Sequence, residues 1–285
     1  MTEVQPRVFL ITGAASGFGL HLTELILQNG EIVVATDIDT SGLSSLSNQY
    51  PTSQLLVRKL DVSKHQEIKD TFAAAKEAFG RINVVYNNAG YGIAAELEAV
   101  PEEQARALFD VVYWGSVNVA LEAVKFFREV NGPEVGGRVI TTGSMLGIIT
   151  FPLCGYYNSA KHALEGFVET LASELDPEWN IKLTLLEPGI FRTGAVSNVR
   201  KIPVPDAYNK PTLPTFVIRG IINDPNTGAD PRKAVKQFYK VASLPDPPLR
   251  LAIGLDAVGA IKQQLGKIGE GVDQYASWSE DLGFD

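Results

Sequence analysis

Val8-Phe-Leu-Ile-Thr12, followed at once by Gly13-Ala-Ala-Ser-Gly17-Phe-Gly19, is the stretch of sequence that decides the fold of this chain. A short apolar run, a glycine-rich turn and a segment with apolar residues at helical spacing predict a strand, a tight turn and a helix. The glycines let the backbone turn sharply and approach a pyrophosphate, whose charge would meet the free N–H groups at the positive end of the helix. Glycines alone are weak evidence, but in this context they predict a dinucleotide site.

The next predicted strand supports this interpretation. Glu31-Ile-Val-Val-Ala-Thr-Asp37 ends in a carboxylate 24 residues after Gly13. An acid at this place can hydrogen-bond the adenosine ribose hydroxyls and repel a 2′-phosphate. The alternative is that Asp37 merely caps the helix that follows it. The absence of Arg or Lys at Ser16, Asp37 and Ile38 agrees with NAD as the cofactor, since nothing there would neutralise a 2′-phosphate.

Strand and helix patterns alternate along the rest of the chain, which predicts an α/β fold with a parallel sheet. The further strands are expected at 55–60, 82–86, 137–143, 181–186 and 249–253, and the helices at 64–79, 101–130 (one or two), 156–175, 231–241 and 256–267. Asn131 to Gly137 is expected to end the helical region, and the tail at 268–285 to be short and mostly polar. The length of 285 residues is expected to form a single domain over 1–285.

A second group of residues has the chemistry to interconvert an alcohol and a carbonyl. Tyr157 and Lys161 lie four apart on a predicted helix and therefore share a face. An ammonium about 5 Å from a phenolate is worth roughly 3 kcal/mol at an effective dielectric near 20, so we expect Lys161 to lower the pKa of Tyr157 by about two units. The phenol could then exchange a proton with a substrate oxygen. Ser144 follows the strand at 137–143, where its hydroxyl could polarise a carbonyl.

The segment from 192 to 230 differs in composition from the rest. Prolines at 203, 205, 211, 214 and 225 are interspersed among apolar residues. A long, proline-broken apolar segment within a compact domain is usually a lid or a binding loop. We expect a cover over an apolar substrate, and the alternative is a purely structural excursion.

Composition and charge exclude several classes of protein. The net charge of −8 and the lack of a Lys/Arg cluster argue against a nucleic-acid partner. Cys154 is the single cysteine, so no internal disulfide can form and no metal site is predicted. The N-terminal residues lack the pattern of a signal peptide, and no run approaches 18 apolar residues, so we expect a soluble, cytoplasmic protein without a membrane partner.

Five motifs in order resemble the short-chain dehydrogenase/reductase family. They are Thr12-Gly13-x-x-x-Gly17-x-Gly19, Asn87-Asn-Ala-Gly90, Ser144 thirteen residues before Tyr157, Tyr157-x-x-x-Lys161, and Pro188-Gly189. The resemblance implies a single doubly wound Rossmann domain with strand order 3-2-1-4-5-6-7 and helices on both faces. It also implies a homodimer or homotetramer formed through the helices at 101–130 and 156–175. The segment 247–254 with a late Trp278 resembles the branch that acts on retinoids and hydroxysteroids.

The resemblance also implies a role for each matching residue. Tyr157 is the acid/base, Lys161 lowers its pKa and holds the nicotinamide ribose, and Ser144 orients the substrate oxygen. The implied cofactor contacts follow the dinucleotide from end to end. They are Gly13, Ser16, Gly17, Phe18 and Gly19 at the pyrophosphate, Asp37 at the adenosine ribose, Asp61 and Val62 at the adenine, Asn88, Ala89 and Gly90 along the nucleotide, and Pro188, Gly189, Ile190 and Thr193 at the nicotinamide.

One position departs from the pattern of the family. Val112 stands where the family usually has an Asn that positions a water behind the Lys in a proton relay. Valine has no hydrogen-bonding group, and Asn118 lies about 240° further round a helix, so it is a poor substitute. The relay would then use other waters or a backbone carbonyl, or activity would be low, or the scaffold would serve another purpose.

The leading hypothesis is an NAD-dependent oxidoreductase that interconverts an apolar secondary alcohol and its ketone. Hydride would pass between the substrate carbon and the nicotinamide while Tyr157 handles the proton. A dinucleotide-binding regulatory protein with little turnover is one alternative, to which Val112 points. An enzyme that catalyses a non-redox elimination or cyclisation on the same scaffold is another.

Overall fold

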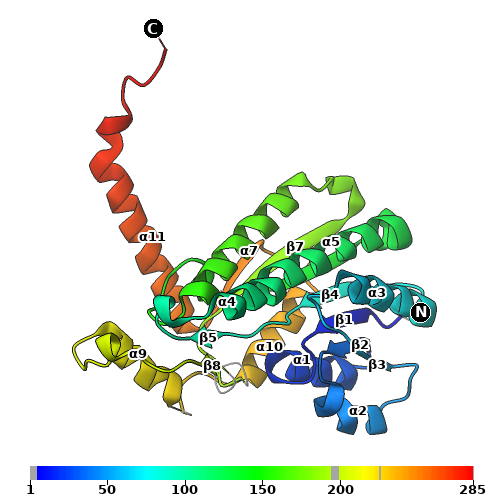
Figure 1. The fold of residues 1–285 in the computed structure, drawn as a ribbon. Coiled ribbons are helices and arrows are strands. Elements are labelled where there is room, and N and C mark those ends of the chain that lie inside the picture. The colour runs from blue at the N-terminus through cyan, green and yellow to red at the C-terminus, as the bar shows by residue number, and fades with distance from the viewer. Residues whose placement is uncertain (1–4, 194–198, 225, 285) are drawn as a thin grey trace.

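The structure is a computed structural model that describes residues 5–193, 199–224 and 226–284. Seven strands form one parallel sheet in the order β3-β2-β1-β4-β6-β7-β9 (Figure 1). Their bounds are Val8–Thr12 (β1), Ile32–Asp37 (β2), Leu55–Lys59 (β3), Val84–Asn87 (β4), Gly137–Thr142 (β6), Ile181–Pro188 (β7) and Arg250–Ile253 (β9). The two-residue strands β5 (Ile93–Ala94) and β8 (Arg200–Lys201) pair with each other apart from this sheet. Counted along the main sheet, the predicted order 3-2-1-4-5-6-7 is confirmed.

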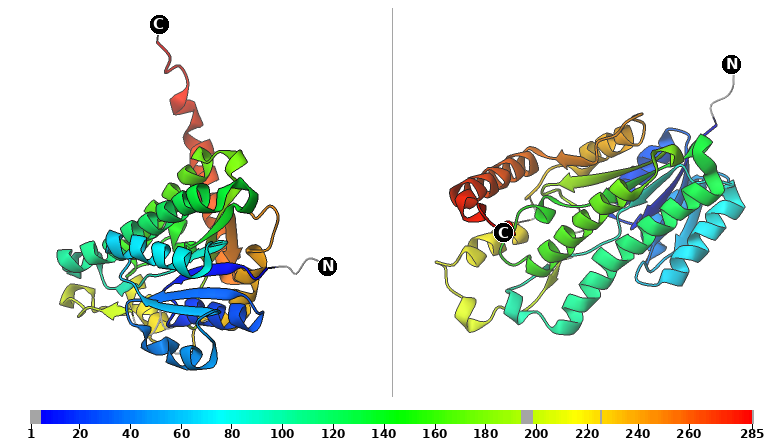
Figure 2. Two further views of the ribbon diagram at one scale, coloured as in Figure 1. Left: turned by 90° about the vertical axis from the view of Figure 1, so that its right-hand side faces the viewer. Right: turned by 90° about the horizontal axis from the view of Figure 1, so that it is seen from above.

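Helices cover both faces of the sheet, as Figures 1 and 2 show. One layer holds α3, α5 and α7, and the other holds α1, α2 and α10. The helices are α1 (Gly17–Gln28), α2 (Ser44–Gln49), α3 (His65–Phe79), α4 (Glu102–Phe109), α5 (Ser116–Phe126), α6 (Gly132–Val135), α7 (Gly155–Glu174), α9 (Pro214–Asn223), α10 (Pro231–Val241) and α11 (Leu255–Tyr275). The fold is therefore the predicted doubly wound α/β arrangement.

The alternation of side chains along β1 explains why both layers are needed. Val8 and Leu10 lie in the core beneath α3, α5 and α7, whereas Phe9 and Ile11 lie in the core beneath α1 and α10. Successive residues of a strand point to opposite faces, so a strand that is apolar throughout must be covered twice. Each of these four residues is at most 1% exposed.

The helical region after β5 runs further than predicted. Helix continues from Glu102 to Val135 through two π-helical stretches, Asp110–Gly115 and Phe127–Asn131. Gly132 interrupts it, because its φ of +67° and ψ of 173° are not helical, and proline is accepted in the first turn of the short segment α6 that follows. The helical region ends at Gly136, which has a φ of +58° and whose added Cβ would lie 2.1 Å from the carbonyl oxygen of Asn180. The break predicted at 131–137 thus contains two interruptions of the backbone, with one short helical turn between them.

This long helix, Glu102–Val135, is apolar enough by length and composition to cross a membrane, with a mean hydropathy of 1.3 over its most apolar window. Half of that window is buried inside the fold. Its buried side chains include Val119, Ala123 and Phe127, which pack against the sheet. The apolar character of the helix is thus accounted for by the core.

The C-terminal helix is longer than the sequence analysis predicted. Instead of a helix at 256–267 and a polar tail, α11 extends from Leu255 to Tyr275 and is followed by a 3-10 turn at Ala276–Ser279. Figures 1 and 2 show it leaving the body of the molecule. Leu265, Ile268 and Val272 keep the helical spacing of apolar residues in the part of the sequence that was expected to be a polar tail.

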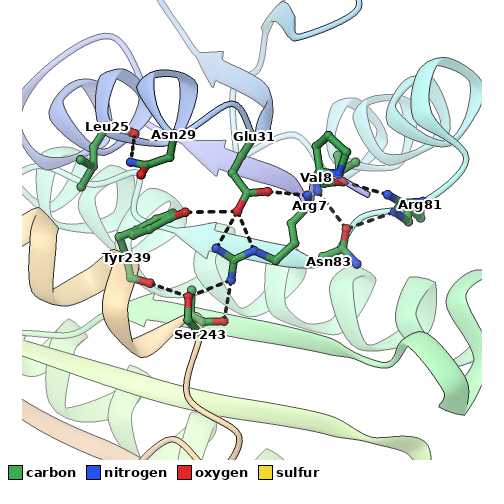
Figure 3. Close-up of polar contacts among 11 residues, drawn as sticks. Arg7, Val8, Leu25, Asn29, Glu31, Arg81, Asn83, Tyr239 and Ser243 are labelled. Atoms are coloured by element: carbon green, nitrogen blue, oxygen red, sulfur yellow. Dashed lines mark hydrogen bonds and ion pairs between the residues drawn. The ribbon is translucent and has the colours of Figure 1, made fainter. Parts of the chain in front are cut away.

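A polar network fixes the amino-terminal edge of the sheet, opposite the predicted site (Figure 3). Arg7 pairs with Glu31 at the start of β2 and donates to the carbonyl of Ala242 at the end of α10. The Tyr239 hydroxyl donates to the same Glu31 carboxylate at 3.1 Å. The Arg7 guanidinium also lies 4.9 Å from the centre of the Phe9 ring. These contacts hold β1, β2 and α10 in register without touching the other edge.

Candidate active site

The predicted site residues follow the carboxyl ends of four parallel strands. Thr12, Asn87, Thr142 and Pro188 are the last residues of β1, β4, β6 and β7. Because these strands are parallel, the loops that follow them meet at one edge of the sheet. The strand order reverses between β1 and β4, which is where open α/β sheets bind ligands.

The glycine loop after β1 has the close backbone packing that a pyrophosphate cradle requires. Gly13 has a φ of +68°, and a Cβ added there would lie 3.0 Å from Cα of Ala89. A Cβ on Gly19 would lie 2.0 Å from the Gly13 carbonyl oxygen. Ser16 is exposed at the N-terminus of α1, whose first turn contains no acidic residue. The positive end of α1 is thus open to an anion.

Phe18 contributes differently from the other residues of this loop. Its ring packs edge-on against Phe191 and Phe238, with ring centres 5.3 Å and 5.1 Å away. The side chain is therefore partly buried against the core beneath α1 and α10.

Asp37 connects the end of β2 to the glycine loop. Its carboxylate accepts hydrogen bonds from the backbone N–H of Ala15 at 3.0 Å and of Asp39 at 3.2 Å. The short helix that follows is capped by Asp39, which accepts from the N–H of Ser41. Asp39 thus caps the helix, and Asp37 lies beside the glycine loop.

Asn88 holds the same loop from the side of β4. Its amide nitrogen donates to the carbonyl oxygens of Thr12 at 3.0 Å and Gly13 at 3.2 Å, and its amide oxygen accepts from the hydroxyl of Thr142 at 3.2 Å. The Thr12 hydroxyl accepts from the N–H groups of Asn88 and Ala89. Thr12 occurs in the first motif but was not predicted as a site residue, although it locks β1 to β4 here.

The predicted adenine contacts lie on the turn after β3. Asp61 accepts from the backbone N–H of Ser63 at 2.9 Å and from its hydroxyl at 2.7 Å. Val62 is buried, and a Cβ on Gly115 would lie 2.8 Å from its side chain. Gly90 has more room, since its added Cβ would meet Val112 at 3.7 Å. The structure thus brings these residues to the same edge as the glycine loop.

Ser144, Tyr157 and Lys161 lie close to one another at this edge of the sheet. The Lys161 ammonium lies 5.6 Å from the centre of the Tyr157 ring and donates a 2.6 Å hydrogen bond to the carbonyl oxygen of Thr142. The hydroxyl of Ser144 caps the following turn by accepting from the N–H of Leu146. Because α7 starts at Gly155, Tyr157 lies in its first turn and Lys161 one turn further on.

The predicted lowering of the Tyr157 pKa is wrong for this structure. Burial raises the pKa of Tyr157 well above its usual value, and a side-chain hydrogen bond with Ser144 only partly offsets this effect. Burial lowers the pKa of Lys161 to about 8, with Glu165 acting in the opposite direction. The sequence estimate omitted the cost of removing both charged forms from water. Nearby, burial raises the pKa of Cys154 to about 11, so its thiol stays protonated.

With this geometry in view, comparison with known proteins identifies the family. The family model described as short chain dehydrogenase matches residues 7–203. The chain belongs to the short-chain dehydrogenase/reductase family. The matched part contains the glycine loop, Asp37, Ser144, Tyr157, Lys161 and the turn after β7.

Two relatives and one solved structure extend the likeness over nearly the whole chain. An uncharacterized oxidoreductase of Schizosaccharomyces pombe is 32% identical over 277 residues, which cover 97% of this chain and 91% of that protein. A 3-ketodihydrosphingosine reductase of Bacteroides thetaiotaomicron is 30% identical over 253 residues, 88% of this chain and 89% of the relative. A short-chain dehydrogenase from Streptomyces avermitilis has a TM-score of 0.87 at 28% identity and covers 99% of this chain with 100% of its own.

Solved structures with the same fold contain a nicotinamide cofactor. Three of them, at 21% to 23% identity and TM-scores of 0.68 to 0.77, contain NAD, NADH or NADP. The family model and the relatives make this protein an oxidoreductase of the short-chain dehydrogenase/reductase family. The solved structures show that proteins with this fold bind NAD in some cases and NADP in others.

Val112 forms an apolar wall at the position of the family's usual Asn. It is fully buried in a cluster with Leu108, Ala160 and Ile93, and the ring of Tyr157 packs against the same cluster. The residue lies within the π-helical stretch Asp110–Gly115. An Asn in this cluster would need polar partners, and its apolar neighbours offer none.

An ionic cluster that the sequence analysis missed lies next to Ser144, Tyr157 and Lys161. Glu165 on α7 accepts from the backbone N–H of Ser144 at 3.2 Å and pairs with Arg250 of β9 at 2.8 Å. Arg250 also pairs with Glu187 and Glu169. A Cβ on Gly147 would lie 2.0 Å from the Glu165 carboxylate, so this glycine admits the acid. The sequence did contain a signal for this cluster. Tyr157, Lys161, Glu165 and Glu169 follow one another at intervals of four residues, which places them on one face of the helix.

The turn after β7 is held by a second residue that was missed. The Asp256 carboxylate accepts from the backbone N–H of Ile190 at 2.7 Å, and a Cβ on Gly189 would lie 2.2 Å from it. Pro188 ends β7, and the N–H of Thr193 donates to the carbonyl of Phe191. Asp256 lies in the first turn of α11. It thereby fixes the turn after β7, which is predicted to border the nicotinamide.

The segment predicted as a lid is attached to this edge by several contacts, among them a bridge between Phe191 and Ala229. Residues 194–198 and Pro225 of that segment lie outside the described residues. Within the described part, β8 pairs with β5, and Arg219 of α9 forms an ion pair with the buried Glu96. Phe216 and Val217 on α9 are 47% and 61% exposed. Helix α9 thus presents apolar side chains without a packed core of its own.

Proposed function

We propose that this protein is an NAD-dependent oxidoreductase that interconverts an apolar secondary alcohol and its ketone. The observation that carries the proposal is the position of Tyr157, with the Lys161 ammonium 5.6 Å from its ring, at the same sheet edge as the Gly13 loop and Asp37. Residues that can move a proton therefore lie beside residues that can hold a dinucleotide.

The roles of the side chains follow from this arrangement. Ser144 holds the substrate oxygen, and Tyr157 gives it a proton on reduction or takes the proton on oxidation. Lys161 stabilises the phenolate when it forms. A nicotinamide supplies or accepts the hydride at the substrate carbon when it is bound. Gly13, Ser16, Gly17 and Gly19 would surround the pyrophosphate, and Pro188 to Thr193 would border the nicotinamide.

The substrate is proposed to be apolar because the surroundings of Tyr157 are apolar. Tyr157 packs beside a cluster that contains Met145, Leu146 and Ile149, with Ile190 at its edge. The exposed apolar residues of α9 would add to this surface when the segment at 192–230 covers a substrate. The name of the Bacteroides relative refers to a keto compound, which agrees with a carbonyl or alcohol substrate.

A direct assay tests the proposal. The purified chain with NAD is expected to oxidise at least one member of a panel of cyclic, steroid-like and aryl secondary alcohols, followed by nicotinamide absorbance. One observation, the apolar wall formed by Val112, favours the alternative of a dinucleotide-binding protein with little turnover. That alternative would be supported by strong thermal stabilisation with NADH and no hydride exchange on deuterated cofactor.

The preference for NAD is expected to depend on Asp37. Because a carboxylate beside a 2′-phosphate costs several kcal/mol, Asp37→Ser should lower the ratio of kcat/KM for NAD to that for NADP at least about tenfold. Asp39→Ser is the matched control, since it removes a carboxylate two residues away that only caps a turn. An unchanged ratio in Asp37→Ser would show that the carboxylate does not select the cofactor.

A further inference from the structure

The exposed part of α11 bears an unpartnered apolar seam. Leu265, Ile268, Val272 and Tyr275 are 50% to 64% exposed, and Trp278 packs edge-on against Tyr275 while remaining 77% exposed. The same seam begins in the body of the protein with the buried Ile261. The spacing from Ile261 to Tyr275 alternates four and three residues. This is the heptad pattern of a helix that packs against another helix, and it is narrower than the face of a helix that packs on a globular body.

The glycines of α11 weaken this helix when nothing packs against it. Gly259, Gly266, Gly269 and Gly271 lie within the helix, and a Cβ added to any of them would meet no atom within 4 Å. Each glycine disfavours a helix by about 1 kcal/mol relative to alanine. A glycine-rich helix of this length is marginal in water without tertiary packing. The contacts within the described chain do not supply that packing beyond Ile261.

The distribution of charge and bulk favours another copy of the same helix. If Leu265 and Val272 are heptad positions a and Ile268 and Tyr275 are positions d, the flanking positions e and g are Lys262, Gln264, Gly269, Gly271, Ala276 and Trp278. None of these is acidic, so the acids Glu270 and Asp273 lie on the outer side. Gly269, Gly271 and Ala276 permit close approach of two backbones near the middle of the seam, and the absence of flanking acids removes the repulsion expected between two acidic helices.

We propose that α11 pairs antiparallel with α11 of a second copy of this chain. Antiparallel pairing places Leu265 opposite Tyr275 and Ile268 opposite Val272, so that one seam is complementary to itself about a twofold axis. It also places the two bodies at opposite ends of the pair, which suits a helix that projects from the body (Figures 1 and 2). The proposal does not rest on the proposed reaction.

The area available is enough for a specific contact. The five exposed apolar side chains offer about 300 to 520 Å² per copy, taking about 60 to 120 Å² for a whole aliphatic and 150 to 250 Å² for a whole aromatic side chain. Since about 60% of an interface is apolar, the pair would bury about 1,000 to 1,700 Å² in total. This range overlaps the lower half of the sizes found for stable interfaces, so the pairing should depend on protein concentration.

Paired glutamates in the seam test the proposal. The double variant Leu265→Glu/Val272→Glu places two charges on the seam. Both side chains are exposed and do not pack in the core of the fold. We measure the apparent mass of the full chain by sedimentation equilibrium at concentrations from about 1 to 100 μM. At the highest concentration, the mass of the variant should be half that of wild type, whether or not another interface exists. The control Gln263→Glu adds a charge on the outer face of α11 and should leave the mass unchanged.

Two further measurements separate the possible occupants. The helical circular dichroism signal of wild type should increase with concentration, because α11 is stabilised by its partner, and that of the seam variant should not. Equal masses for wild type and seam variant would overturn the proposal. Binding of monomeric wild type, but not of the variant, to phosphatidylcholine vesicles would overturn it in favour of a membrane surface.

Discussion

Tyr157→Phe is expected to lower kcat for alcohol oxidation about 10²- to 10⁴-fold, because it removes the group that takes the proton from the substrate. The loss of one hydroxyl leaves the ring in its apolar cluster, so the fold and the dinucleotide site should be preserved. Binding of NADH, measured by fluorescence titration, should therefore change little. A variant that keeps wild-type turnover would remove Tyr157 from the reaction.

Tyr156→Phe is the matched control for this substitution. Tyr156 is adjacent in the same first turn of α7, and no hydrogen bond joins its side chain to Ser144 or Lys161 in the described part of the chain. We expect wild-type turnover from Tyr156→Phe. A similar loss from both substitutions would indicate damage to the start of α7 and not the loss of an acid/base.

The pKa shifts at Tyr157 and Lys161 give the pH dependence a direction. Burial holds the phenol protonated, because the pKa of Tyr157 is raised. Reduction starts from the phenol and should vary little as pH rises from about 6 to 8, whereas oxidation starts from the phenolate and should become faster over the same range. Burial lowers the pKa of Lys161 to about 8, so its ammonium should also begin to lose its charge towards the upper end of this pH range. In Tyr157→Phe the pH dependence of the residual oxidation should be lost.

Motifs with local causes were predictable from the sequence. The Gly13 turn requires a positive φ and close backbone contact, and such turns leave a glycine pattern that can be recognised in one chain. The spacing of Tyr157 and Lys161 is likewise a local property of one helix. The strand order was available from the resemblance, and the alternation of strands and helices explains why the sheet is parallel throughout.

Features that depend on distant partners were not predictable. Glu165 and Arg250 are 85 residues apart in sequence, and nothing local marks either as half of a buried pair. Burial also changed the expected ionisation of Tyr157, because desolvation depends on every neighbour of the ring. Gly136 ends the long helix where its backbone approaches Asn180, and α11 extends beyond the end predicted at residue 267.

Arg250→Met is expected to destabilise the protein by about 3 to 5 kcal/mol, since it leaves buried carboxylates without their cation. The side chains of Glu165 and Glu187 are 1% and 3% exposed, and both meet the guanidinium of Arg250. Methionine fills a similar volume but provides no hydrogen bond. The free energy of unfolding in urea measures the loss, and Arg106→Met is the control, because it breaks an ion pair that is 76% and 79% exposed and should have no measurable effect.

The same loss should shrink as the pH is lowered. Burial already raises the pKa values of Glu165 and Glu187, with Arg250 opposing the rise, and removing Arg250 should raise them further. A carboxyl whose pKa is higher in the folded than in the unfolded chain takes up a proton on folding, so lower pH favours the folded state. The deficit of Arg250→Met should therefore be larger at about pH 8 than at about pH 5. Adding Glu165→Gln should recover part of the stability at pH 8, and a deficit independent of pH would mean that lost packing, and not unpaired charge, is the cause.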